Sequence, residues 1–211
     1  MSVRRICALL GVSALMGTAT IAGATTASAD DHDDDLRTRS LATVLAKDGG
    51  GYDRNPWDYD ILDNAVHAVL AAKPTSPVAV LADGSVPLTA FLPNDLAFRR
   101  LANDLTGTWR GSESEVFGRV AGVGIDTVEA VLLYHVVPGA TITSRQAKKA
   151  DGDALTTALG PTFTVDVRGS RIVLVDADPD DANASVVAPD INKGNRQIAH
   201  GISRVLRPAD L

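Results

Sequence analysis

Apolar residues in the first half of the chain recur every three or four positions, which is the spacing of one helix face. The longest such stretch, residues 58–73, stops before Pro74 and predicts a helix. Shorter stretches predict helices that begin near Ser40, at Asn94 and near Glu113. Most of the helical structure is therefore expected ahead of the final third of the chain.

A further helix is predicted around the apolar residues 131–133. Asp126 and Glu129 precede this run with the spacing of a capping box, in which Asp would take the place of the usual Ser or Thr. We therefore expect the helix to open at Asp126.

Two apolar runs before the third helix, residues 77–81 and 86–91, flank the dipeptide Asp83–Gly84. Asp-Gly is the preferred chemistry of a two-residue hairpin turn, because its second residue readily adopts a positive φ. The pattern predicts that the two runs pair as a β-hairpin.

The period of the pattern changes to two in the last third of the chain. Apolar and polar residues alternate over 162–167, and the turn Gly169–Ser170 leads into a second run at 171–175. Two more strand-like runs cover residues 185–187 and 197–206. Helices that precede strands in this way predict an α+β domain with a mainly antiparallel sheet.

The N-terminal residues have the plan of a secretory leader. Arg4–Arg5 is followed by an uncharged apolar stretch, residues 6–24, and by the small-x-small cleavage signal Ala27–Ala29. Residues 1–29 are therefore predicted to be a cleaved signal peptide rather than a membrane anchor, because three glycines interrupt the apolar stretch. The released protein is expected to be secreted, without a membrane span.

The remaining residues are expected to form an acidic flexible tail, residues 30–37, and one domain, residues 38–211. Cys7 is the only cysteine and leaves with the predicted leader, so the mature protein would contain no disulfide and no cysteine metal site. The whole chain has a formal net charge of −6. An acidic protein repels nucleic acid and anionic membranes, so neither is an expected partner.

Three segments resemble the signatures of the fasciclin (FAS1) domain family. They are Thr89–Phe98, which runs through Phe-x-Pro into a capped helix, Leu132–Gly139, which is centred on Tyr-His, and the closing Gly194–Pro208. The resemblance spans residues 40–208 and implies a β-wedge or sandwich of mainly antiparallel strands with several helices packed around it. Two departures stand out: Ser203 occupies a position where the family usually has an acid, and the segment Gly49–Tyr59 is longer than usual.

The resemblance also implies a function in extracellular adhesion or matrix interaction, without catalysis. We expect an interaction module that binds an extracellular protein or a cell-surface polymer, and no cofactor. Common enzyme signatures are absent from the sequence. Two alternatives stay open: a small-molecule or lipid carrier that uses an apolar cleft, and a secreted hydrolase with a dispersed catalytic site.

The family motifs supply the first candidate contact residues, which are Phe91, Pro93, Asp95, Tyr134 and His135. His135 has a second interpretation. It lies between the apolar residues 131–133 and 136–137, so it is predicted to be buried and to hydrogen-bond helix to strand.

The long insert supplies the second set of candidates. Tyr52, Trp57 and Tyr59 bring three aromatic residues into eight positions. Aromatic side chains on loops make good binding anchors, which favours a contact surface. The alternative is a lid that closes one end of the core.

Three polar features are weaker candidates. The acidic segment 176–183 does not fit a calcium-binding EF-hand loop and is expected to be a solvated turn, with a weak calcium site as the alternative. His67 is expected to be solvated, and His200 is interpreted as a surface residue of its strand.

Cleavage after Ala29 would place His32 third from a free amine, behind Asp30 and Asp31. An amine, two backbone amides and an imidazole can form a square-planar site that suits Cu(II) or Ni(II). The alternative is a histidine without a role in a solubilising tail.

Overall fold

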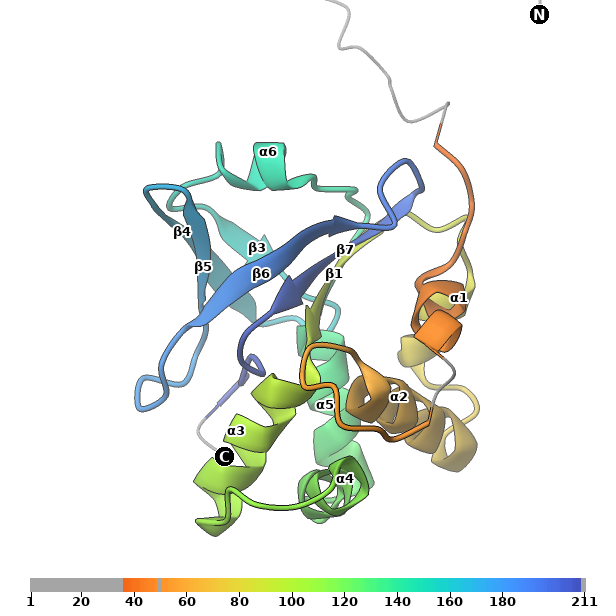
Figure 1. Cartoon of the computed structure of the whole chain (residues 1–211). Coiled ribbons are helices and arrows are strands. Elements are labelled where there is room, and N and C mark those ends of the chain that lie inside the picture. Colours follow the sequence, from red (N-terminus) through yellow and green to blue (C-terminus); the bar gives the residue numbers. More distant parts are fainter. Residues whose placement is uncertain (1–35, 49–50, 210–211) are drawn as a thin grey trace, which may run out of the picture. The chain divides into compact units, whose positions relative to one another are not determined.

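A computed structural model describes residues 36–48 and 51–209 of the chain (Figure 1). The predicted leader, residues 1–29, and the predicted copper or nickel site at Asp30, Asp31 and His32 lie outside the described residues and stay predictions.

The first part of the described chain is mainly helical, as the apolar spacing predicts. Side-chain caps begin several of the helices: Ser40 accepts from Thr43 N, Asn94 accepts from Ala97 N at 3.0 Å, and Ser112 forms a capping box with Glu115. The helices are α1 (Leu41–Leu45), η2 (Ala46–Asp48), α2 (Asp60–Ala72), η3 (Pro77–Ala82), α3 (Asp95–Thr106), α4 (Glu113–Ala121), α5 (Ile125–Tyr134) and α6 (Ser144–Ala147).

The prediction that α5 opens at Asp126 is wrong. The helix begins one residue earlier, at Ile125, after Gly124 turns the chain with φ of 97°. Asp126 therefore lies inside the first turn, where it forms an ion pair with Lys73.

The predicted hairpin around Asp83–Gly84 is also wrong. The run 77–81 belongs to the 3-10 helix η3, whose start is capped by Ser76, and only the second run forms a strand, β1 (Leu88–Pro93). A side chain at Gly84 would overlap the backbone of Thr38, since a Cβ there would lie 1.9 Å from its carbonyl oxygen. This glycine permits close packing instead of a hairpin.

Seven strands form one sheet in the order β2-β1-β7-β6-β5-β4-β3. All neighbours are antiparallel except β1 and β7, which pair in parallel over their full length. Because β1 has β2 on one side and β7 on the other, it leaves no edge for the run 77–81. The other strands are β2 (Val136–Pro138), β3 (Ala154–Thr156), β4 (Thr162–Arg168), β5 (Arg171–Val175), β6 (Ala184–Ile191) and β7 (Gln197–Ile202).

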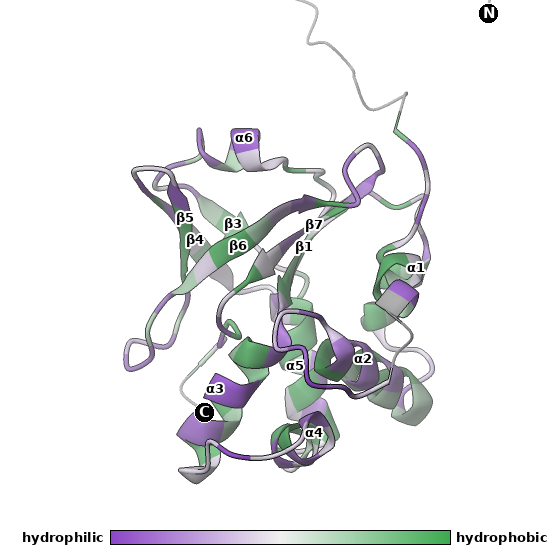
Figure 2. Ribbon diagram, viewed as in Figure 1, coloured by the Kyte–Doolittle hydropathy of each residue, from purple (hydrophilic) through white to green (hydrophobic). Residues whose placement is uncertain are grey.

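The sheet is a wedge with helices packed around it, which confirms the predicted α+β class (Figure 1). β1 and β7 are buried along their full length. Hydrophobic residues dominate α5, whereas α3 turns a hydrophilic face outward (Figure 2). Among the helices of the described residues, none is both long and apolar enough to cross a membrane.

Candidate functional site

Tyr134 lies at the end of α5 and is fully buried. Its hydroxyl donates a hydrogen bond to the carbonyl oxygen of Thr162 at 2.8 Å, and its ring meets that of Phe163 edge-on at 6.1 Å. Burial raises the pKa of this hydroxyl to about 12. Tyr134 thus fastens α5 to β4 from inside the core.

His135 follows Tyr134 and has only 4% of its surface exposed, which confirms its predicted burial. Nδ1 lies 2.7 Å from the carbonyl oxygen of Val131, and Nε2 accepts from the backbone N–H of Leu206 at 2.9 Å. A neutral ring that is protonated on Nδ1 satisfies both bonds. Burial lowers the pKa of His135 to about 4, so the ring stays neutral near pH 7.

The other three motif residues, Phe91, Pro93 and Asp95, are buried as well. Phe91 packs against Phe163 with ring centres 5.1 Å apart, so the first and second motifs meet on the same ring of β4. A partner could not touch any of the five motif residues without opening the core.

Most of the described residues of the insert, 51–59, lie on the surface. Figure 1 shows it running between α2 and α3. Its backbone is hydrogen-bonded to the first turn of α3, since Asp95 N donates to Asp58 O at 3.1 Å and Leu96 N donates to Pro56 O at 2.9 Å. Asp53 N donates to Glu113 Oε2 at 2.6 Å, which ties the loop to α4 too. The loop is therefore irregular but fastened at several points.

The three aromatic residues of the insert point to different environments. Trp57 is 62% exposed. Tyr52 is partly exposed, with its ring centre 6.2 Å from that of Phe117. Tyr59 packs inward against β7, where a Cβ on Gly201 would lie 2.2 Å from its hydroxyl oxygen. Tyr59 therefore faces the core side of the insert and Trp57 faces outward.

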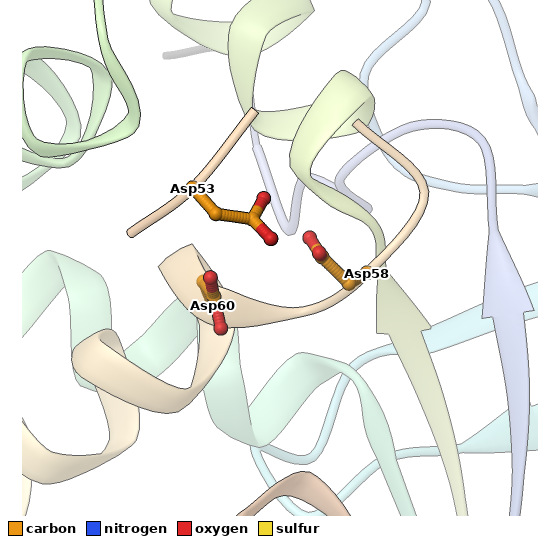
Figure 3. A group of neighbouring side chains, drawn as sticks. All are labelled: Asp53, Asp58 and Asp60. Carbon is orange, nitrogen blue, oxygen red and sulfur yellow. The ribbon is translucent and has the colours of Figure 1, made fainter. Parts of the chain in front are cut away.

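A group of carboxylates lies beneath the insert. Oxygens of Asp53, Asp58 and Asp60 lie within 4.8 Å of one another, and the same holds for Asp60, Asp95 and Glu113. Figure 3 shows Asp53 and Asp58 facing each other, with Asp60 at the entry to α2. All five residues except Asp53 are buried. We call these five residues the acidic group.

Three members of the acidic group are the first residues of helices: Asp60 of α2, Asp95 of α3 and Glu113 of α4. Helix N-termini favour negative charge, which accounts for acids at these positions. Asp95 also acts across elements, because its Oδ1 accepts from Ile61 N at 3.1 Å and so caps α2, which has no side-chain cap of its own. Sequence reasoning missed the group because its members come from three separate segments.

Glu113 and Asp95 differ in how their carboxylates are paired. Arg99 Nη2 lies 3.2 Å from Glu113 Oε1. The second oxygen of Asp95, Oδ2, is buried and accepts no hydrogen bond from the described residues. The pKa of Asp95 is raised to about 8, mainly by burial; the carboxyls of Asp58 and Glu113 contribute to the rise, and the hydrogen bond from the Ile61 N–H opposes it.

His200 is buried, so its interpretation as a surface residue is wrong. Nδ1 accepts from Asp190 N at 3.2 Å, and Nε2 lies 2.9 Å from the carbonyl oxygen of Ile142. Its ring also lies 5.6 Å from that of Phe91, centre to centre. His67 is exposed, as expected.

The segment 176–183 is only partly the predicted solvated turn: Pro179 and Asp180 are exposed, but other acids of the segment are engaged by arginines. Asp178 is buried and accepts from Arg207 Nη1 at 3.1 Å, while Asp181 accepts from Arg204 Nη1 at 2.6 Å. Asp176 accepts from Arg207 N at 2.7 Å. These acids bind the arginines that follow β7 and hold the C-terminal segment in place.

The apolar cavity beside His135 is small. It is lined by residues of α2, α3, α4 and α5 and has a volume of about 20 Å³. This is room for roughly one water molecule, whereas small-molecule pockets measure roughly 300–1,000 Å³. The cavity is therefore a packing defect of the core and not a carrier cleft.

Comparisons with known proteins agree with this architecture. The matching solved structures include the FAS1 domain pair from the insect cell adhesion molecule fasciclin I, with a TM-score of 0.57 and 14% sequence identity. The match covers 81% of this chain and 51% of that chain, so this chain spans about half of the domain pair. A comparison with curated protein sequences found no match. The Fasciclin domain model matches residues 62–208, and the chain belongs to the fasciclin domain family.

Proposed function

We propose that the protein is a secreted, non-catalytic interaction module that binds an extracellular protein or a cell-surface polymer through its insert. The observation that carries this proposal is the exposure of Trp57 on a loop whose backbone is fastened to α3 and α4. A large aromatic side chain on a preordered loop loses little entropy on binding, which is typical of interface anchors.

The family supports an adhesion-type role, since FAS1 domains are adhesion-type modules and the matching structure comes from a cell adhesion molecule. The insert is a better contact surface than the Tyr-His motif. Tyr134 and His135 are inside the core, whereas Trp57 and Tyr52 reach the surface.

The hydrogen bonds of the two buried histidines support a non-catalytic role. A general base needs a free ring nitrogen within reach of its substrate. Both ring nitrogens of His135 and both of His200 are instead engaged with backbone groups.

A binding experiment with the protein secreted by its own cells tests the proposal. Mass spectrometry first establishes whether the mature chain begins at Asp30. Its binding to envelope and extracellular material from the same cells is then measured for wild type, Trp57→Ala and the control Trp109→Ala, which removes another exposed tryptophan. We expect Trp57→Ala to weaken binding about 10-fold or more. Equal binding by Trp57→Ala and wild type would contradict the insert as contact surface.

A further inference from the structure

The acidic group has the dimensions of a metal site. Oxygens of Asp60, Asp95 and Glu113 all lie within 4.8 Å of one another. Two oxygens that bind the same Ca²⁺ at about 2.3–2.6 Å can be at most about 5 Å apart. A single ion can therefore reach all three carboxylates with little movement of the side chains.

The buried oxygen of Asp95 is a second and independent observation. Asp95 is 0% exposed, and its Oδ2 accepts no hydrogen bond from the described residues. Its Oδ1 is already used to cap α2 through Ile61 N. A buried carboxylate oxygen without a donor is costly, so a positive species at this position would stabilise the fold.

Two positive species could occupy this position. One is a proton, because the Asp58 carboxyl is close enough to share one with Asp95, and burial raises the pKa of Asp95 to about 8. The other is a metal ion, which would neutralise several carboxylates at once. The geometry favours the metal, because one ion can contact Asp60, Asp95 and Glu113 at once, whereas one proton is shared by only two carboxyls.

We propose that the acidic group binds one Ca²⁺ through Asp60, Asp95 and Glu113, with Asp53 and Asp58 of the insert beside it. The donors are all carboxylate oxygens, which suit hard cations, and histidine and cysteine are absent from the group. Ca²⁺ fits an irregular arrangement of ligands on a loop and three helix ends better than Mg²⁺, which demands near-octahedral geometry. Extracellular calcium modules have Kd values of about 0.1–1 mM.

The ion would join the insert to the helices that carry it. Glu113 already holds Asp53 N through Oε2, and Asp58 is hydrogen-bonded through its carbonyl to α3. Calcium at this point would therefore add to the contacts that already hold the segment presenting Trp57. The proposed calcium site is argued from the carboxylates alone. It does not require the insert to be a contact surface.

Calcium titration of the mature protein after treatment with EDTA and desalting tests the site. We expect one Ca²⁺ per chain by calorimetry, weaker binding of Mg²⁺, and a Tm that rises by roughly 5–10 °C when Ca²⁺ exceeds Kd 100-fold. No binding at 10 mM Ca²⁺, together with an unchanged Tm, overturns the proposal and leaves a proton as the occupant.

Two variants locate the ion and one variant is a matched control. Asp60→Asn and Asp95→Asn keep the shape of the side chain but remove charge, and each should weaken Ca²⁺ binding at least 10-fold. Asp126→Asn also changes an acid in the first turn of a helix, α5, but its side chain is 86% exposed and outside the group. It should bind Ca²⁺ as wild type does. Unchanged affinity in Asp60→Asn, which does not touch the cap of α2, would overturn the proposal even if Asp95→Asn failed to fold.

Discussion

His135 and Asp95 are both buried polar residues of the family motifs, and they differ in how their polar atoms are satisfied. Both ring nitrogens of His135 have a backbone partner, from Val131 and Leu206. Asp95 has one satisfied oxygen and one that accepts no hydrogen bond from the described residues. The site of His135 is complete within the described residues, whereas Asp95 keeps one oxygen that accepts no hydrogen bond from them.

This difference separates a structural role from a binding role better than burial does. A buried group whose hydrogen bonds are complete stabilises the fold and has little left to offer a ligand. A buried acidic group with an oxygen that accepts no hydrogen bond can still bind a proton or an ion. The histidine of the motif belongs to the first kind and the aspartate to the second.

The largest expected effect is a loss of stability in acid. The pKa of His135 is about 4 in the folded protein and 6.5 when unperturbed, so the unfolded chain takes up a proton first as pH falls. His135 should therefore destabilise the fold progressively from about pH 6.5 to pH 4, by at most about 3 kcal/mol.

Urea unfolding of wild type and His135→Gln across this pH range measures that effect. Glutamine does not titrate, so the difference between the two curves isolates His135 from the other groups, including His200, whose pKa burial also lowers. Parallel curves would show that His135 can be protonated without cost in the folded state.

The next effect concerns the hydrogen bonds of His135 themselves. His135→Ala strands the N–H of Leu206 and should lower the free energy of unfolding by about 1–3 kcal/mol. His67→Ala is a matched control, because His67 Nδ1 also contacts the carbonyl oxygen four residues earlier, but its side chain is 71% exposed. The control should change stability by less than about 0.5 kcal/mol. An equal loss in the free energy of unfolding in His135→Ala and His67→Ala would contradict a stabilising role for the buried ring of His135.

A smaller effect tests the inward part of the insert. Gly201→Ala places a methyl group 2.2 Å from the hydroxyl oxygen of Tyr59, and we expect a loss of about 1–2 kcal/mol in the free energy of unfolding. Tyr59→Phe removes that oxygen, so the double variant should recover part of the loss. Additive losses would mean that Tyr59 does not pack against Gly201 in solution.

The smallest effect on stability is expected for the outward part of the insert. Trp57 is largely exposed, so Trp57→Ala should change the free energy of unfolding by less than about 0.5 kcal/mol. Thermal and urea unfolding measure it. A loss of several kcal/mol, as for a core tryptophan, would make the whole insert a lid and remove Trp57 as a contact residue.

Local chemistry predicted much of the fold. The caps at Ser40, Asn94 and Ser112 act within one turn of the chain, so the helices could be placed from sequence. Local sequence could not show that Asp83–Gly84 does not form a hairpin turn. Gly84 packs closely against the backbone of Thr38, which is far away in sequence. For the same reason, the burial of Asp178 depends on Arg207, which lies beyond two further strands.

The sequence by itself determined the α+β class, the family signatures and the burial of His135, because apolar periodicity and short motifs act over a few residues. The tertiary structure alone decided that the other motif residues are inaccessible as well and that Asp60, Asp95 and Glu113 meet. Each of these three acids begins a different helix, and only the packing of α2, α3 and α4 under the insert brings the three helix ends together. The approach of these three acids leaves no local pattern in the sequence, because entire helices and strands separate the acids along the chain.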